Sequence, residues 1–82
     1  MLITKKEFAA LQKNYGLTAR ELEVVKLLFN GVDSNKDIAE RMGITVGTAR
    51  NYAHTIFIKL KVESKLQAVV KLSIEAKKLT EK

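Results

Sequence analysis

Cysteine and proline are absent from the 82-residue sequence, glycine occurs only four times, and aromatic residues make up 6% of it. Without cysteine the chain has neither disulfides nor thiolate metal ligands, which agrees with a reducing compartment. No run approaches the roughly 18 apolar residues that a membrane helix needs, and no secretory signal opens the chain. We therefore expect a cytoplasmic protein without a membrane partner.

What the sequence does contain favours one small helical domain. Its length allows a single modest core, and aliphatic residues, lysine and glutamate are good helix formers. The formal charge of +6 makes an anionic partner plausible. Between Arg41 and Val62 there are four cations and no carboxylate. This stretch is therefore the expected basic surface.

Helix boundaries are marked by hydroxyl residues followed three positions later by an acid or amide, a pattern that satisfies free backbone donors at a helix start. Four such pairs occur: Thr4 with Glu7, Thr18 with Glu21, Ser34 with Asp37, and Ser64 with Gln67. Thr45 offers a fifth cap, and glycines 16, 31 and 43 stand where helices should stop. The sequence predicts helices at about 4–15, 18–30, 34–42, 45–61 and 64–80.

The predicted helix 45–61 has two different faces. At about 100° per residue, one side gathers apolar residues and is the expected buried face: Ala49, Ala53, Ile56 and Leu60. The other side faces outward and gathers Gly47, Arg50, Asn51, His54 and Ile58. A merely solvated face would more usually hold lysine and glutamate. Arginine and asparagine suit base edges in a DNA major groove, where they pair with guanine and adenine respectively.

The preceding segment predicts the geometry for such an insertion. The small Ala39 permits two helices to cross closely, and Gly43, four residues later, permits a sharp turn. Ile44, Ala49 and Tyr52 supply apolar contacts. This pattern predicts a helix-turn-helix over about 35–54, with 34–42 as the supporting helix and 45–61 as the recognition helix.

Five motifs in order give the chain a family resemblance. They are LTxRExEV at 17–24, G…SNKxIA at 31–39, ITxxTxRN at 44–51, IxxKLxV at 56–62 and QAVV at 67–70. Over about residues 17 to 72 the sequence resembles the LuxR/GerE-type DNA-binding domain of bacterial transcription regulators. The resemblance implies an all-α, four-helix domain over 17–82, with 1–16 as an additional N-terminal helical extension or linker.

The resemblance also implies roles for individual residues. Arg50, Asn51 and His54 occupy the positions that usually meet bases. A second group would contact or approach phosphates: Asn35, Lys36, Thr45, Thr48 and Lys59. Arg20 and Glu21 match structural positions, so we expect internal polar contacts from them.

Several residues depart from the family pattern, among them Val46, Gly47 and Ile58. Val46 and Gly47 stand where charged side chains are common, and glycine in a helix costs roughly 1 kcal/mol relative to alanine. The missing side chain at Gly47 would let the helix end approach DNA closely. Ile58 is expected to be exposed unless the N-terminal helix or a partner covers it.

The last predicted helix carries two apolar faces. Ala68, Val69, Leu72, Ala76 and Leu79 form one. Leu66, Val70 and Ile74 form the other, with Gln67 beside them. A monomer needs only the first, so the second predicts a homodimer through this helix, as the family resemblance also implies. The alternative is that the helix at 4–15 covers this second face with Phe8, Leu11 and Tyr15.

These features predict a sequence-specific, double-stranded DNA-binding transcription regulator, with RNA polymerase as a further candidate partner. Two alternatives are a helical protein-interaction module and a promoter-binding fragment similar to sigma-factor region four. The single histidine, His54, has no second ligand nearby, so we expect no metal. No carboxylate pair, nucleophile with a base, or phosphate loop predicts an enzyme, a cofactor or a small-molecule ligand.

Overall fold

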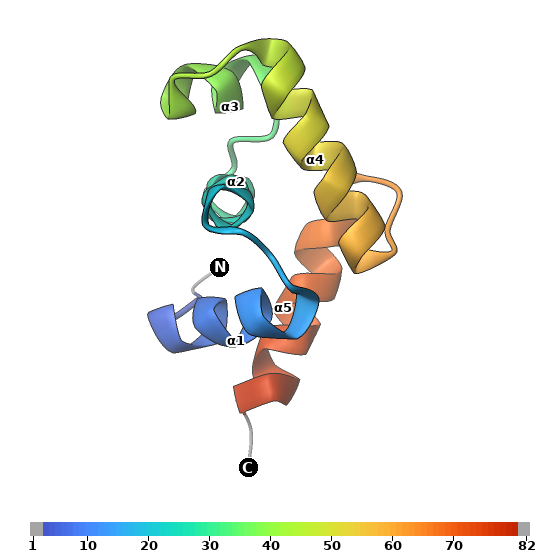
Figure 1. The fold of residues 1–82 in the computed structure, drawn as a ribbon. Helices are drawn as coiled ribbons and strands as arrows, with labels where there is room; N and C mark the ends of the chain where they lie inside the picture. The colour runs from blue at the N-terminus through green and yellow to red at the C-terminus, as the bar shows by residue number, and fades with distance from the viewer. Residues whose placement is uncertain (1–2, 81–82) are drawn as a thin grey trace.

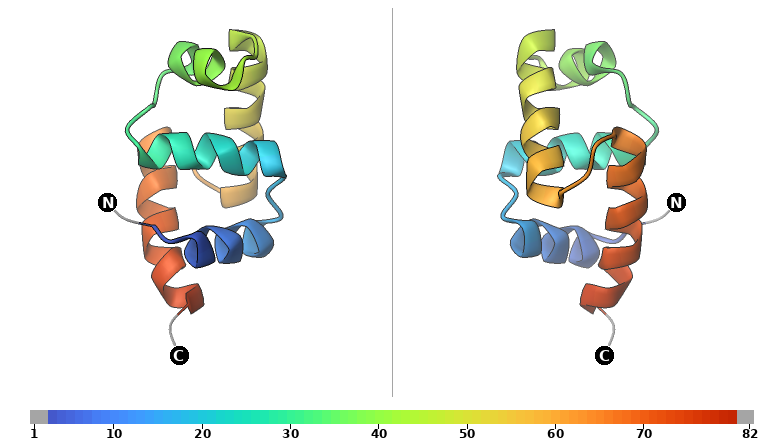
Figure 2. Two further views of the ribbon diagram at one scale, coloured as in Figure 1. Left: turned by 90° about the vertical axis from the view of Figure 1, so that its left-hand side faces the viewer. Right: turned by 90° about the vertical axis from the view of Figure 1, so that its right-hand side faces the viewer.

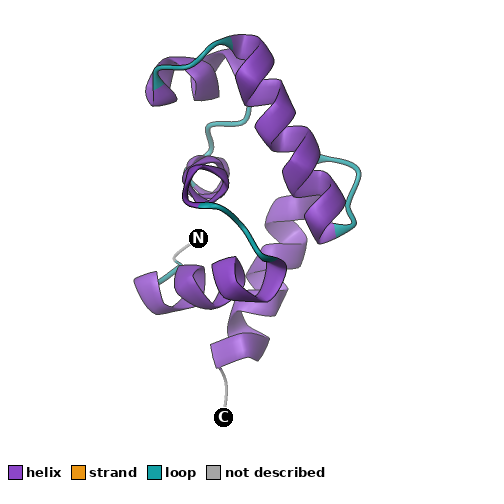
Figure 3. Cartoon of the chain, in the orientation of Figure 1, coloured by secondary structure: helices purple, strands orange, loops and turns teal. Residues whose placement is uncertain are grey.

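The computed structural model describes residues 3–80, which form five α-helices and no strand (Figures 1 and 3). The helices are α1 (Lys5–Tyr15), α2 (Ala19–Phe29), α3 (Asn35–Met42), α4 (Val46–Leu60) and α5 (Lys65–Thr80). Each agrees with its predicted range to within one residue at either end. The predicted all-α fold is therefore confirmed.

The helix starts depend on the predicted hydroxyl caps, with two differences. Reciprocal capping boxes form at Thr4 and Thr18, as expected. Ser34 accepts the N–H of Asp37 at 3.0 Å, but within the described residues only this half of the predicted pair forms. At α5 Ser64 accepts the N–H of Gln67 at 3.1 Å as predicted, but the Gln67 side chain accepts the N–H of Glu63 at 2.8 Å in place of that of Ser64. Side chains at these positions thus satisfy backbone donors that a helix start leaves free.

The helix ends follow the glycines only in part. Gly16 and Gly43 end α1 and α3 in the left-handed conformation, with φ of 65° and 67°. The C-cap of α2 is Asn30, and Gly31, one position later, adopts the expected positive φ, 83°. At the end of α4 it is Lys61 that adopts a positive φ, 59°. This conformation is strained for a residue with a side chain.

The helices form an elongated molecule, and different helices make up its two ends. Its extents are 40 × 22 × 20 Å. In Figures 1 and 2, α3 and the first turns of α4 lie at one end, and α1 and the C-terminal half of α5 lie at the other, with α2 between them. The N-terminal helix α1 is therefore remote from the predicted helix-turn-helix.

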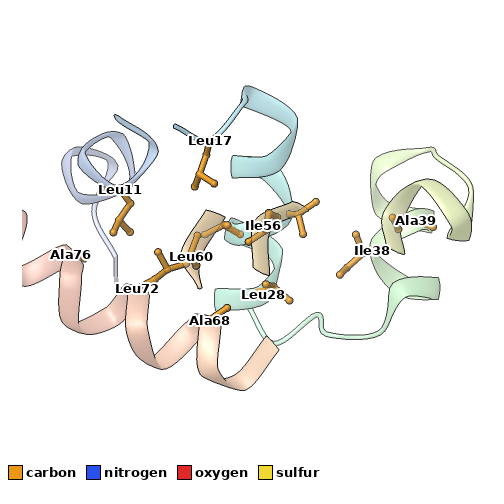
Figure 4. Close-up of a cluster of buried hydrophobic side chains, with 13 residues drawn as sticks. Leu11, Leu17, Leu28, Ile38, Ala39, Ile56, Leu60, Ala68, Leu72 and Ala76 are labelled. Carbon is orange, nitrogen blue, oxygen red and sulfur yellow. The ribbon is translucent and has the colours of Figure 1, made fainter. Parts of the chain in front are cut away.

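One continuous core joins the two ends. Figure 4 shows Ile38 and Ala39 at one end of this cluster and Leu11 beside Leu72 at the other. The predicted buried face of α4 is confirmed, since its four members are at most 5% exposed: Ala49, Ala53, Ile56 and Leu60. None of the helices within residues 3–80 is both long and apolar enough to cross a membrane.

The N-terminal helix packs mainly against α5, but not on the face that the alternative prediction required. Leu66, Val70 and Ile74 remain 74%, 51% and 52% exposed. The prediction that α1 covers this second apolar face is therefore wrong, because α1 places the fully buried Leu11 in the core cluster with Leu72 instead. We define Leu66, Val70 and Ile74 as the open face of α5.

The structure also shows where three further apolar residues lie. Ile58 is 63% exposed, so α1 does not cover it. Leu79, predicted with the inward face of α5, is 38% exposed because it lies near the end of that helix, beyond the buried Ala76. Phe8 packs edge-on against Phe29 of α2, with 5.7 Å between the ring centroids.

Candidate nucleic-acid interface

The helix-turn-helix is built from α3, α4 and the turn between them. The turn begins at Gly43, and the N–H of Ile44 donates back to the Ala39 carbonyl at 3.0 Å. Ala39 and Ala49 are 4% and 0% exposed, so small side chains fill the contact between the two helices, as predicted. The Arg20 guanidinium donates to the Met42 carbonyl at 3.3 Å. This bond ties α2 to the end of α3 and is one of the internal polar contacts expected of Arg20.

The outward side of α4 is open. Arg50, Asn51 and His54 are all exposed, and none of them makes a side-chain hydrogen bond or ion pair that would hold it against the rest of residues 3–80. The nearest helix, α3, adds the exposed Arg41 in its last turn. The exposed side chains on this side of α4 therefore have hydrogen-bond donors that the protein itself does not use, and no carboxylate lies in the same stretch of sequence. We call Arg50, Asn51 and His54 the outward triad.

The N-terminus of α4, like that of α5, has no acid in its first turn. The first turns of α1, α2 and α3 contain Glu7, Glu21 and Asp37 respectively, whereas that of α4 contains no acid. An acid in the first turn compensates the positive end of the helix dipole. At α4 no acid of the first turn compensates that positive end.

Thr45 and Thr48 at this helix start are bonded to each other. The Thr45 hydroxyl accepts the Thr48 N–H at 3.1 Å and donates to the Thr48 hydroxyl at 2.9 Å. Both residues are exposed. These two hydrogen bonds fix the geometry of the cap. Both hydroxyl oxygens can still accept a hydrogen bond, and the Thr48 hydroxyl can still donate one to an outside partner.

The two predicted residues at the start of α3 have different surroundings. The Asn35 side chain accepts from the Lys65 ammonium at 2.9 Å, and Lys65 also donates to the Asp33 carbonyl. Lys36 is exposed. Lys65 was missed by sequence reasoning, because its contact joins α5 to a loop 30 residues away and leaves no local pattern.

Lys59 faces inward. Its ammonium lies 2.6 Å from the Glu21 carboxylate and donates to the Gly16 carbonyl at 2.9 Å. The Glu21 side chain is only 5% exposed. A phosphate contact by Lys59 would therefore have to share the ammonium with these two acceptors. The expected internal contact of Glu21, by contrast, is present.

The ion pair with Lys59 changes the acidity of Glu21. Burial alone would raise the pKa of this carboxyl, but hydrogen bonds from Lys59 and from the Thr18 N–H, together with the Lys59 charge, outweigh burial and lower the pKa. Glu21 is thus held ionised where α2, α4 and the end of α1 meet. Through Lys59 it holds the last turn of α4 in place, and it does not lie on the outward face of that helix.

Comparison with known proteins places this arrangement in a family. The family model described as bacterial regulatory proteins, luxR family, matches residues 15–72. The transcriptional regulatory protein LnrK of Bacillus subtilis is 44% identical over 54 residues, which cover 66% of this chain and 24% of LnrK. DesR of the same organism is 40% identical over 55 residues, covering 67% and 27%. The response regulator VraR of Staphylococcus aureus is 39% identical over 54 residues, covering 66% and 25%.

No solved structure gives a significant match. The matched part of this chain spans about a quarter of the length of these curated relatives. The matched residues 15–72 include α2, α3, α4 and the first half of α5, and so contain the whole helix-turn-helix. The chain therefore belongs to the luxR family of bacterial regulatory proteins, through its helix-turn-helix domain.

Proposed function

We propose that the protein is a transcription regulator that binds double-stranded DNA in a sequence-specific manner and inserts α4 into the major groove. The observation that carries this proposal is the outward triad, which is exposed on the recognition helix and not engaged by the rest of the protein. Arginine and asparagine can each form two hydrogen bonds with a base edge in that groove. The names of the relatives, which describe transcriptional regulators, support the same function.

Affinity would come from phosphates on either side of the groove. Lys36 and Arg41 are exposed cations on α3, and each phosphate that a cation neutralises releases counterions. The N-terminus of α4, with Thr45 and Thr48 and without an acid in its first turn, would meet a phosphate through backbone N–H groups. Asn35, held by Lys65, would lie near the same strand. These contacts position the protein, and the outward triad supplies discrimination.

We further propose that the protein binds as a homodimer through the open face of α5. A shallow groove there is lined mainly by apolar side chains, among them Val62, Leu66, Val70 and Ile74, and Gln67 lies at its rim. Three large apolar residues at four-residue spacing on one exposed helix face are unusual for a monomer. In a two-fold dimer the same face pairs with itself, so two copies of α4 would meet two half-sites about one helical turn apart.

The DNA proposal predicts a specific loss on replacing Arg50 by alanine. After a binding site has been selected from random duplex DNA, the Arg50→Ala variant should bind it about tenfold to thirtyfold more weakly, corresponding to about 1.4–2 kcal/mol, because a paired base edge loses its donors. Fluorescence anisotropy with the selected duplex measures the effect. Discrimination against a changed base pair should be lost at one position of each half-site.

Two control variants separate base reading from charge. Lys36→Ala should weaken binding to all sequences alike and reduce the slope of log affinity against log salt by about 1. Lys78→Ala, which replaces an exposed lysine in the last turn of α5, should leave affinity unchanged. Unchanged affinity in a folded Arg50→Ala protein would contradict the proposal and favour a protein-interaction module.

The dimer proposal predicts that Val70→Asp weakens the dimer. Placing a charge at the centre of the open face forces its desolvation on association, so sedimentation equilibrium should show at least a tenfold weaker dimer, corresponding to about 1.4 kcal/mol. Affinity for a two-fold symmetric site should fall, while affinity for one half-site should not. Leu79→Asp, on α5 but outside the open face, is the matched control. A wild-type protein that remains monomeric at high concentration would refute the dimer.

A further inference from the structure

Of the large apolar side chains that are exposed within residues 3–80, two lie on α4. Val46 is 41% exposed and Ile58 is 63% exposed. The exposed apolar residues of α5 belong to the open face or lie near its C-terminus. Val46 differs from all of these because it is the first residue of α4, at the end of the recognition helix that enters a groove first.

The position of Val46 at the first residue of α4 leaves its side chain partly open to a partner. The Cα–Cβ bonds of a helix tilt toward its N-terminus, so a side chain at the first position leans beyond the helix end. Val46 precedes Arg50 by four residues, which places it one turn, about 6 Å, nearer that end and about 40° from Arg50 around the axis. It therefore lies beside Arg50, at the border between the outward triad and the buried face of α4, and a partner can cover the 41% of its surface that is exposed.

Gly47 makes the approach of a partner easier. Its backbone is not in the left-handed region, and a Cβ atom there would meet nothing nearer than the Thr45 hydroxyl at 3.9 Å. Nothing in the protein requires glycine at this position, although glycine disfavours the helix relative to alanine. A partner that comes close to the backbone of the first turn would require it.

The stretch of sequence that contains Val46 carries cations and no acid. The segment from Arg41 to Val62 has no carboxylate, and the first turn of α4 has no acid. An apolar protein surface would gain nothing from these charges and would leave the outward triad unpaired. In the DNA major groove, on the other hand, the thymine C5-methyl is an apolar group among hydrogen-bonding base edges. It is therefore the partner that fits both the valine and its surroundings.

We infer that Val46 reads a thymine, by packing its isopropyl group against the C5-methyl of one thymine in each half-site, beside the base that Arg50 contacts. This inference rests on the proposed function. Ile58 does not share the role, because it lies about 18 Å from Val46 along the helix and so cannot contact the same base.

The test replaces thymines of the selected duplex one at a time by deoxyuridine, which differs from thymine only in lacking the methyl group. Wild-type protein should lose affinity about fourfold at one thymine per half-site, since burial of one methyl-sized group is worth about 0.8 kcal/mol. Val46→Ala should bind the thymine duplex more weakly by a similar factor and should not distinguish deoxyuridine from thymine at that position. Ile58→Ala should keep the full wild-type sensitivity.

The outcomes separate the inference from the proposed function. If the protein selects a duplex but Val46→Ala retains the wild-type sensitivity at every thymine, the assignment to Val46 is wrong and DNA binding stands. If no duplex is selected, the proposed function fails, and the inference fails with it. Because Val46 is exposed, Val46→Ala should melt like the wild type, so a loss of binding cannot be attributed to unfolding.

Discussion

Replacing Leu11 by alanine is expected to reduce the free energy of unfolding by about 3 kcal/mol, the middle of the range for a fully buried leucine. Leu11 has no exposed surface and belongs to the same core cluster as Leu72 and Ala76 of α5. Its truncation leaves a cavity between α1 and α5 that neither helix can easily close. The whole free energy of unfolding of a domain of this size is only about 5–10 kcal/mol. The melting temperature should therefore fall by more than about 10 °C.

The control is an exposed leucine of α5, the helix against which α1 packs. Leu66→Ala, at a residue 74% exposed, should change the free energy of unfolding by no more than about 0.5 kcal/mol at a concentration where the protein is monomeric. Chemical denaturation followed by circular dichroism measures both variants. If Leu11→Ala is as stable as the wild type, α1 is a linker that contributes nothing to the domain. A large loss with one cooperative transition means that α1 is part of it.

Replacing Glu21 by glutamine should reduce the free energy of unfolding by about 2 kcal/mol at pH 7. The carboxylate accepts from Lys59 at 2.6 Å and from the Thr18 N–H at 2.8 Å, and hydrogen bonds to charged groups are worth about 1.5–3 kcal/mol each. Glutamine keeps the size and one acceptor oxygen but loses the charge. The loss stays below that of a wholly buried pair because Lys59 is 29% exposed and can regain water.

The Glu21 effect should depend on pH in a defined direction. The pKa of Glu21 is lowered in the folded protein, so the unfolded chain takes up its proton first as the pH falls. The stabilisation is therefore fully present above the ordinary pKa of 4.5 and is lost as the pH falls through the lower folded value. The stability difference between the wild type and Glu21→Gln should shrink over that window and remain constant above about pH 6.

Glu23→Gln is the matched control, two residues along the same helix. Glu23 pairs with Arg20 at 2.9 Å, but both side chains are exposed, at 49% and 43%. Exposed ion pairs contribute about 0–1 kcal/mol, so this variant should lose much less stability at pH 7. Equal losses in the two variants would mean that the inward position of Lys59 has no special importance.

The helix boundaries and the buried face of the recognition helix follow from local pattern. A hydroxyl such as Thr18 followed by Glu21 fixes a helix start through contacts within four residues, and the 3.6-residue period alone brings Ala49, Ala53 and Ile56 to one side. The family assignment also needed only motifs in order along the chain. These features require no knowledge of which helices meet.

The location of α1, by contrast, could not be predicted from periodicity. Both α1 and the open face of α5 offer apolar residues, and sequence pattern gives no reason to prefer one pairing. In the structure α1 packs through Leu11 on the inward face of α5 and leaves Leu66 and Ile74 exposed. The direction of Lys59, toward Glu21 and Gly16, is a contact of the same long-range kind.

The sequence by itself determined where the helices begin, which side of α4 is apolar, and which family the chain belongs to, because each depends on residues within a few turns of one another. Only the tertiary structure decided which apolar face of α5 stays open and that Lys59 turns inward. It also decided that Val46 stays 41% exposed. These depend on how helices distant in sequence share one small core, whose limited volume accommodates some apolar faces and excludes others.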